Sequence, residues 1–309
     1  MKPQADTLAL LRALAPVEGY NLTALPDVRV LRSDQPLADT PVLYDPGIVI
    51  VGQGAKRGYF GDEVFVYDEQ HYLAVAVPVP FTMQSDGSPE RPLLALYLHL
   101  DFPVAAQLMV ELDRVGGAAS PQAPRSLVSS PMDGDMQQAV HHLLQVLSHP
   151  VDAAILGRAA ARALYYRVLT GPQGQALRAA LTQQGQFGKV GKALRRIHAG
   201  HAQRLDLTQL AQEAGMSVPS FHAHFKAVTQ TSPMQYLKST RLHQSRLLMV
   251  REGMTAAAAA HAVGYESTSQ FNREFKRLFG LPPAAEVRRM KASFALPPAQ
   301  PGADFVASH

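Results

Sequence analysis

The side chains best suited to chemistry in this sequence lie between residues 267 and 277. Phe271 and Phe275 are four residues apart, so in a helix they share one face, and Asn272 and Arg273 point outward. An arginine guanidinium can donate two hydrogen bonds to a guanine edge, and an asparagine amide can pair similarly with adenine. This pattern predicts a helix that reads base edges in nucleic acid; a solvated polar helix face is the alternative.

This segment is the second copy of an internal repeat. Residues 210–226 and 259–276 each contain a short apolar helix, a glycine, a serine and a helix with two phenylalanines. The glycines, Gly215 and Gly264, are 49 residues apart, and the phenylalanines are 50 apart. Glycine allows the left-handed turn that ends a helix, and serine caps the start of the next. Each copy therefore predicts a helix-turn-helix unit.

Basic residues are concentrated around the repeat. Residues 189–291 contain 16 Lys and Arg against 6 Asp and Glu, a net charge of +10; the rest of the chain contains 13 against 19, a net charge of −6. A basic block beside an acidic remainder favours a polyanion-binding domain joined to a domain of another kind. Chance variation in charge is the alternative. Because both repeat copies fall inside the basic block, we predict double-stranded DNA as the partner.

The repeat and its surroundings resemble the AraC-type family of bacterial transcription regulators. The resemblance is carried by Ala214 to Lys238, by Arg241-Leu242, by Ser245 to Leu248, and by Val263 to Gly280 with Pro283. It spans about residues 195–290. In this family two helix-turn-helix units are joined by a long helix, here about residues 234–250. Both units then enter successive major-groove segments, about one helical turn apart.

The resemblance and the outward helix faces imply two sets of DNA contacts. The predicted base readers are His222, Thr268, Ser269, Asn272 and Arg273. The predicted phosphate contacts are Lys226, Arg241, Arg246, Lys276 and Arg277. Phosphate contacts position a protein on DNA, whereas base contacts carry the specificity. Since the first unit offers only His222 as a hydrogen-bonding reader, we predict that the second unit supplies more of the specificity.

Two features depart from the family pattern: Gln230, and the run Ala256 to Ala260, which replaces a more varied helix without harming helicity. Gln230 stands where the family usually has glycine, after the first recognition helix. We therefore predict that Gln230 adopts a left-handed backbone conformation, at a cost of about 1 kcal/mol.

The N-terminal half predicts a small antiparallel barrel or sandwich. Between residues 40 and 102, short β-branched and aromatic runs alternate with turn residues. The predicted strands are residues 42–44, 48–51, 64–67, 72–77 and 93–98. From Pro103 onward apolar residues recur every three or four positions. The predicted helices are residues 104–115, 136–147 and 153–169, with a loop over residues 116–132.

Scattered residues in this half resemble the cupin-like N-terminal domain of one AraC-type subfamily. They are Tyr44 to Pro46, Val51 to Lys56, Tyr67 and Tyr72-Leu73. The resemblance implies a barrel that binds an effector or supports dimerisation, with small aldehydes or alcohols as effectors, and helices that pair two chains. The predicted effector contacts are Tyr44, Gln53, Tyr67 and Tyr72. Aromatic side chains that only fill the barrel core are the alternative.

These patterns predict a two-domain α+β chain. An N-terminal cupin-like antiparallel β-barrel with following helices precedes a C-terminal all-α double helix-turn-helix domain. The predicted boundaries are 1–185 for the effector and dimerisation domain, 186–194 for a linker, 195–290 for the DNA-binding domain and 291–309 for a disordered tail.

Patterns typical of enzymes and metal sites are missing from the sequence. Cysteine is absent, which excludes disulfides and thiolate chemistry. His71 and His99 lack neighbours that would complete a metal site, and there is no P-loop, His-Glu-x-x-His or Gly-x-Ser-x-Gly motif. We therefore expect no cofactor, no metal and no enzymatic activity. A small-molecule enzyme on a cupin barrel with an accessory DNA-binding module is the alternative.

The predicted function is a one-component transcription regulator that binds promoter DNA as a homodimer. RNA polymerase would be a further partner of an activator. The apolar run at residues 8–11 is broken by Arg12, so we predict neither a signal peptide nor a membrane span, and a cytoplasmic location.

Overall fold

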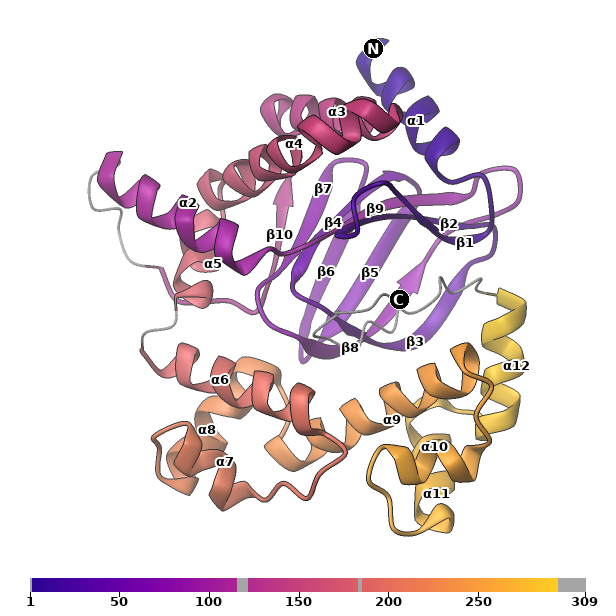
Figure 1. Cartoon of the computed structure of the whole chain (residues 1–309), viewed down its shortest axis with the longest axis vertical. Helices are drawn as coiled ribbons and strands as arrows, with labels where there is room; N and C mark the ends of the chain where they lie inside the picture. Colours follow the sequence, from indigo (N-terminus) through magenta and orange to yellow (C-terminus); the bar gives the residue numbers. More distant parts are fainter. Residues whose placement is uncertain (1, 116–121, 183–184, 294–309) are drawn as a thin grey trace.

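A curled sheet separates two groups of helices in this chain. The computed structural model describes residues 2–115, 122–182 and 185–293. One group of helices, drawn at the top of Figure 1, covers one side of the sheet, and a separate helical domain lies below it. The two-domain α+β fold predicted from the sequence is confirmed, with the barrel open as a half-barrel rather than closed.

The sheet has ten strands within the described residues, all paired antiparallel. They are β1 (Gly19–Leu22), β2 (Val28–Ser33), β3 (Leu37–Tyr44), β4 (Gly47–Gln53), β5 (Ala55–Phe60), β6 (Glu63–Asp68), β7 (His71–Val75), β8 (Val79–Ser85), β9 (Leu93–His99) and β10 (Leu127–Pro131). Their order is β1-β2-β9-β4-β7-β6-β5-β8-β3, with β10 beside β7. The five predicted strands correspond to β3, β4, β6, β7 and β9.

The strands that the sequence pattern missed carry polar residues or lack a continuous apolar run. β5 and β8 each bury only every second residue, so in β5 Lys56, Gly58 and Phe60 face the interior. A Cβ on Gly58 would lie 2.9 Å from the ring of Phe81 on β8. Glycine at this position therefore lets Phe81 pack into the concave side of the sheet.

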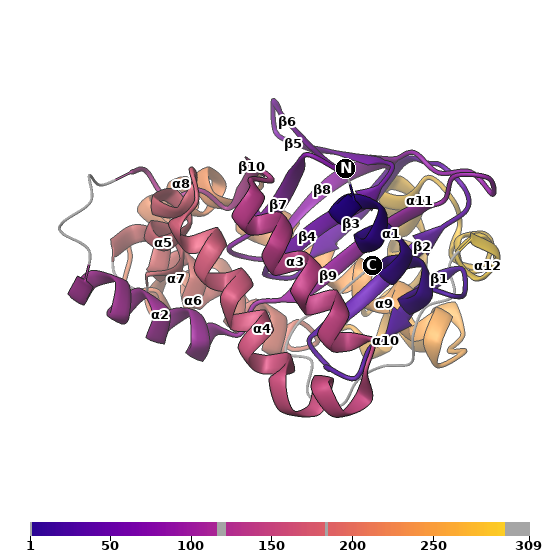
Figure 2. The same cartoon turned by 90° about the horizontal axis from the view of Figure 1, so that it is seen from above.

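Among the residues that the structure describes, five helices accompany the sheet. They are α1 (Lys2–Leu14), α2 (Phe102–Val115), α3 (Gly134–Leu147), α4 (Pro150–Thr170) and α5 (Gly174–Leu181). Asp133 caps α3 by accepting a hydrogen bond from the Met136 amide at 2.8 Å. Figure 2 shows α3 and α4 lying over the sheet, and α1 packs on α3. The three predicted helices of this half are confirmed as α2, α3 and α4.

Seven helices form the C-terminal domain in the described part of the chain. They are α6 (Gly185–Gly200), α7 (Leu207–Glu213), α8 (Val218–Thr229), α9 (Pro233–Arg251), α10 (Ala256–Ala262), α11 (Thr268–Phe279) and α12 (Pro283–Ser293). The predicted connecting helix is α9, which runs beneath the sheet from α7 and α8 to α10 and α11 (Figure 1). No helix among the described residues is long and apolar enough to cross a membrane.

The predicted linker, loop and C-terminal tail each differ in part from the structure. Residues 186–194, predicted as a linker, lie inside α6, so this connection is helical. Of the predicted loop, residues 127–131 form β10, because they complete the backbone hydrogen bonds of β7, and residues 116–121 lie outside the described residues. Of the predicted tail, residues 291–293 end α12 and residues 294–309 lie outside the described residues.

Gln230 adopts the left-handed conformation that the sequence predicts, with φ at 56°. Its backbone amide donates to the Lys226 carbonyl and closes the end of α8. The Gln230 side chain lies against Gly61, at the turn between β5 and β6. The departure from glycine thus adds a contact between the helical domain and the sheet.

Candidate DNA interface and interior polar cluster

The two helix-turn-helix units, α7 with α8 and α10 with α11, are built by the same local interactions. Ser217 and Ser267 cap α8 and α11 by accepting hydrogen bonds from the amides three residues later, at 3.4 and 3.3 Å. Gly215 and Gly264 precede these caps with φ of 64° and 85°. The phenylalanines at positions four apart are fully buried in both units. The predicted repeat is therefore confirmed as a structural repeat.

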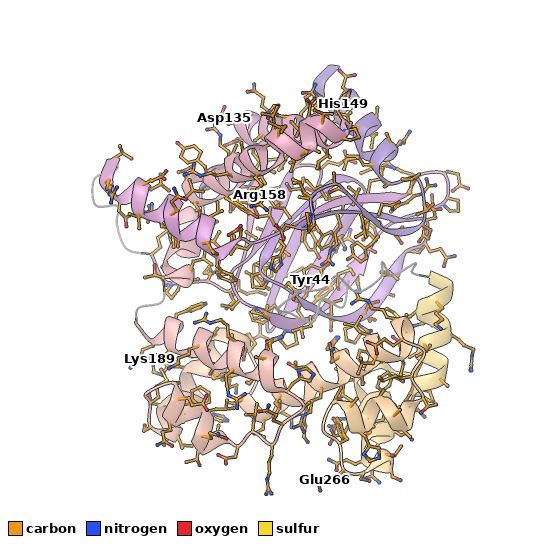
Figure 3. All side chains as sticks on the ribbon, viewed as in Figure 1. Tyr44, Asp135, His149, Arg158, Lys189 and Glu266 are labelled. Atoms are coloured by element: carbon orange, nitrogen blue, oxygen red, sulfur yellow. The ribbon has the colours of Figure 1, made fainter. Side chains whose placement is uncertain are left out.

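Burial of the phenylalanines leaves the predicted base readers at the surface. His222, Ser269, Asn272 and Arg273 are exposed, and Thr268 is half-buried. Glu266, two residues before α11, is labelled in Figure 3 at the end of the helical domain farthest from the sheet. The start of α11 therefore points away from the N-terminal half and is open to a large partner.

Three of the predicted phosphate contacts are also exposed. Lys226 lies on α8, and Lys276 and Arg277 lie on α11, on the same helices as the base readers. Cationic side chains beside a reading face can reach the phosphates that flank the groove. Their assignment to phosphates remains a prediction.

Arg246 is buried, so the prediction that it contacts phosphate is wrong for this arrangement of the domains. Its side chain is 0% exposed and pairs with Glu286 at 3.2 Å. The guanidinium lies 4.2 Å from the centre of the Phe279 ring and donates to the Pro41 carbonyl of β3 at 3.4 Å. The family resemblance placed Arg246 correctly on the connecting helix α9, but it could not show that the sheet covers this face.

Arg241 is tied to the backbone. Its guanidinium donates to the carbonyls of His201 at 2.7 Å, Gln203 at 2.8 Å and Gly264 at 3.3 Å. Partial burial lowers its pKa. In this structure Arg241 therefore connects protein segments, and a phosphate contact would require it to leave them.

The helical domain is also joined to the sheet by its first unit. The Tyr236 hydroxyl of α9 donates to the Pro78 carbonyl at 2.9 Å, and the Ser126 hydroxyl donates to the Val228 carbonyl of α8 at 2.6 Å. All four residues of these two bonds lie in buried or partly buried surroundings. Contacts of this kind give the N-terminal half a direct route to the position of the DNA-binding units.

A cluster of polar side chains lies inside the half-barrel. This tyrosine–lysine cluster consists of Tyr44, Lys56, Tyr67 and Tyr97, none more than 7% exposed. The Lys56 ammonium donates to the hydroxyls of Tyr97 at 2.7 Å and Tyr44 at 3.1 Å. The Tyr44 hydroxyl lies 3.0 Å from that of Tyr97 and 3.3 Å from that of Tyr67. Tyr44 is labelled in Figure 3 within the curve of the sheet.

The electrostatics of this cluster are unusual for a protein interior. Burial lowers the pKa of Lys56 to about 7 and raises the pKa of each tyrosine well above its ordinary value. At neutral pH the phenols are therefore uncharged. Within the described residues Lys56 makes no ion pair with a carboxylate. The cluster thus combines a buried amine with hydroxyl groups and has no anion to balance it.

Two of the four predicted effector contacts lie in this cluster, and two do not. Tyr44 and Tyr67 belong to it, whereas Gln53 accepts from Arg12 of α1 at 2.9 Å and donates to the Pro92 carbonyl at 2.6 Å. Tyr72 is buried with its hydroxyl near Gly171, at the end of α4. Gln53 and Tyr72 therefore hold helices against the sheet, and the prediction that they share a site with Tyr44 is wrong.

Sequence reasoning missed Lys56 and Tyr97. A lysine in a strand usually marks a solvent-facing position, so its type gave no signal. The alternation of β5 about Gly58 was the available clue, because Gly58 and Lys56 are two residues apart and share a face.

A second buried group lies next to the cluster. Burial raises the pKa of Asp45, which follows β3, from 3.8 to about 7, although the charges of Arg29 and Arg251 oppose this shift. Arg251 is the last residue of α9. The charge of Arg251 at the end of α9 thus favours the ionised form of Asp45, which burial disfavours.

No group of three or more His, Asp or Glu side chains in the described ranges could hold a metal ion.

A half-barrel packed on two helix-turn-helix units with exposed polar and basic faces is the architecture of a DNA-binding regulator with a separate N-terminal domain. Two family models match the chain in this arrangement. Residues 24–176 match the N-terminus of AraC-type transcriptional regulators, and residues 210–289 match a helix-turn-helix domain. The chain belongs to the AraC-type family of transcription regulators.

Individual relatives match about a third of the chain. A putative AraC-like transcription regulator of Streptomyces lividans is 34% identical over 94 residues, which cover 30% of this chain and 31% of that protein. The RCS-specific transcriptional activator RclR of Escherichia coli is 35% identical over 92 residues, covering 30% and 32%. The chain thus spans about a third of the length of these relatives.

The fold of the whole chain is similar to a solved structure. A crystal structure of ToxT from Vibrio cholerae, bound to an unsaturated fatty acid, has a TM-score of 0.61 at 11% identity, and the match covers 84% of this chain and 93% of that one. This likeness includes both the half-barrel and the helical domain.

Proposed function

We propose that this protein is a one-component transcription regulator that binds promoter DNA through α8 and α11. The observation that carries this proposal is the structural repeat, which presents two capped helices with exposed polar and basic faces inside the basic block. The relatives are named as transcription regulators. Regulation of transcription, rather than catalysis, is the role that these observations favour, and it requires a cytoplasmic location.

Selection of the full chain on a randomised-site library tests this proposal. We expect an enriched site with two recognition segments about one helical turn apart. With roughly 6–10 phosphate contacts, affinity should fall by about 10³-fold or more between 50 and 200 mM salt. Failure to enrich any sequence, or affinity independent of salt, would contradict the proposal.

Small-molecule sensing by the tyrosine–lysine cluster is the second part of the proposal. A buried amine without an anionic partner favours a ligand with a carboxylate or carbonyl oxygen, because such a group would accept hydrogen bonds from Lys56 and the phenols. ToxT, which has a similar fold, holds an unsaturated fatty acid in its crystal structure. Small aldehydes and alcohols remain candidates from the family resemblance.

Thermal unfolding with octanoate, octanal and octanol as probes tests the effector proposal. A ligand that binds the folded chain raises its unfolding temperature. We expect stabilisation by octanoate or octanal that is lost in Lys56→Met and retained in Lys192→Met, which removes an exposed lysine of α6. Equal stabilisation of both variants would place the ligand elsewhere.

The third part of the proposed function is dimerisation through α4. Val151, Ile155 and Leu156 are 75%, 75% and 45% exposed on this helix, and Tyr166 extends the apolar surface. A second copy of this surface would cover it symmetrically. We expect light scattering to report a dimer at micromolar concentration, and a monomer for Ile155→Asp. Val64→Asp, which changes an exposed valine of β6, is the control and should stay dimeric.

If the protein activates transcription, we propose RNA polymerase as a further partner.

A further inference from the structure

The turn of the second helix-turn-helix unit packs against the loop that leads into the first. A Cβ added to Gly264, in the turn of the second unit, would lie 2.5 Å from the carbonyl oxygen of Ala202, in the loop that leads into the first unit. No real Cβ approaches a backbone oxygen so closely. The turn of one unit therefore packs on the loop of the other with no room for a side chain.

Arg241 joins the two sides of this contact. From α9, which lies between the units, it donates to the carbonyls of His201 and Gln203 on the first side and to the carbonyl of Gly264 on the second. We call Arg241, Gly264 and residues 201–203 the inter-unit contact. All three acceptors are backbone carbonyls, so the bonds fix the path of the main chain rather than the position of flexible side chains.

The second unit is fixed to the helix that carries Arg241. Lys238 of α9 pairs with Glu274 of α11 at 3.1 Å. Glu274 also accepts from the Tyr265 hydroxyl at 2.8 Å and from the Gln270 amide at 3.1 Å. Since α11 and α9 are held together in this way, Arg241 transmits the position of the second recognition helix to the first unit.

We infer that Arg241 is a positioning residue that sets the spacing and relative rotation of the two recognition helices. This inference rests on the proposed DNA binding and specifies how the two recognition segments are kept at one separation. One inserted base pair shifts a segment by about 3.4 Å along the DNA and rotates it by about 35°. Two units held together by the inter-unit contact cannot adjust to both the shift and the rotation.

Spacing selectivity is the measurement that tests this inference on DNA. The full chain is titrated on its selected site and on the same site with one base pair inserted between the segments. We expect the wild type to prefer the original spacing by about tenfold or more, comparable to the loss from a mismatched base pair. Arg241→Met should reduce this preference to less than about threefold.

Arg241→Lys separates the positioning role from a phosphate contact. Lysine keeps the positive charge, so it would retain affinity and salt dependence if Arg241 contacted phosphate. A single ammonium cannot reach three carbonyls in the geometry of the guanidinium fork. We therefore expect Arg241→Lys to lose spacing preference as Arg241→Met does. Retention of the wild-type preference by Arg241→Lys, or an equal loss on both spacings in Arg241→Met, would overturn the inference.

The repeat supplies a matched control for the glycine. Gly215 and Gly264 occupy the same turn with positive φ, but a Cβ on Gly215 meets nothing within 4 Å. Alanine at either position places a Cβ in a left-handed backbone conformation, but only the Cβ of Gly264→Ala would press on Ala202 and Arg241. We expect Gly264→Ala to reduce spacing preference and Gly215→Ala to preserve it. Equal effects of the two substitutions would contradict the role of the contact.

A distance measurement without DNA makes the test independent of the proposed function. The chain has no cysteine, so Ala227→Cys on α8 and Ser269→Cys on α11 allow a pair of spin labels at exposed positions. We expect a narrow distance distribution in the full chain and a broader one after Arg241→Met. An unchanged distribution in Arg241→Met overturns the inference. If the wild type binds no DNA, the proposed function fails, and the spin labels still decide whether Arg241 holds the units together.

Discussion

Lys56 provides a test of the interior of the half-barrel that does not require a known ligand. It is 0% exposed, and burial lowers its pKa from 10.5 to about 7. Between about pH 7 and pH 10.5, Lys56 is protonated in the unfolded chain but not in the folded chain. The free energy of unfolding therefore rises with pH across this window, and the full destabilisation is present below pH 7.

The magnitude follows from the size of the shift. One pKa unit corresponds to about 1.4 kcal/mol, so the fully charged buried amine destabilises the fold by up to about 5 kcal/mol. Between pH 6 and pH 9 about 2–3 kcal/mol of this is relieved, because the folded lysine becomes neutral while the unfolded lysine remains charged. The two hydrogen bonds to Tyr44 and Tyr97 offset part of it, by about 1 kcal/mol each.

Urea unfolding of the wild type and of Lys56→Met, followed by circular dichroism at pH 6 and pH 9, measures this effect. We expect the methionine variant to be the more stable at pH 6 and its advantage to shrink by about 2–3 kcal/mol at pH 9. Lys192→Met is the control, because it removes the same charge from an exposed position of α6. A stability difference between Lys56→Met and wild type that does not change with pH would refute the lowered pKa of a buried amine at Lys56.

Three further outcomes follow from the site geometry. Arg273→Ala should cost about 1–3 kcal/mol on the selected DNA site and relax preference at one base pair, with a smaller loss for His222→Ala; equal loss on all sequences would make Arg273 a phosphate contact. Asp45→Asn should remove a decrease in stability between pH 4 and pH 7 of up to about 4 kcal/mol, since the raised pKa lets the folded chain keep a proton that the unfolded chain releases; pH titration of unfolding checks the slope. Arg246→Met should destabilise the chain by up to about 3 kcal/mol, because buried Glu286 loses its partner on α9 and keeps only Arg289 at 2.9 Å, and adding Glu286→Gln should restore part of this in urea unfolding; no recovery would argue against the ion pair as the cause.

The sequence by itself determined the DNA-binding units. Their glycine turns, serine caps and buried phenylalanines depend on contacts between residues only a few positions apart, and such contacts leave a periodic pattern in the sequence. The outward positions of Asn272 and Arg273 follow from the same periodicity. Five of the strands were predictable from local patterns too, whereas the long connecting helix was predicted from the family resemblance.

Only the tertiary structure decided which polar side chains the two halves enclose. Lys56 joins Tyr44 and Tyr97 because the sheet curls and brings β3, β5 and β9 around one interior, and residue type alone would place a lysine outside. Arg246 belongs to the basic block, and its residue type alone would place it at the surface, but β3 and α12 cover it with the Pro41 carbonyl and the Glu286 carboxylate. These contacts join segments as many as 205 residues apart, and no local pattern encodes them. The packing of sheet against helix therefore separates the charges that remain available for DNA from those that hold the domains together.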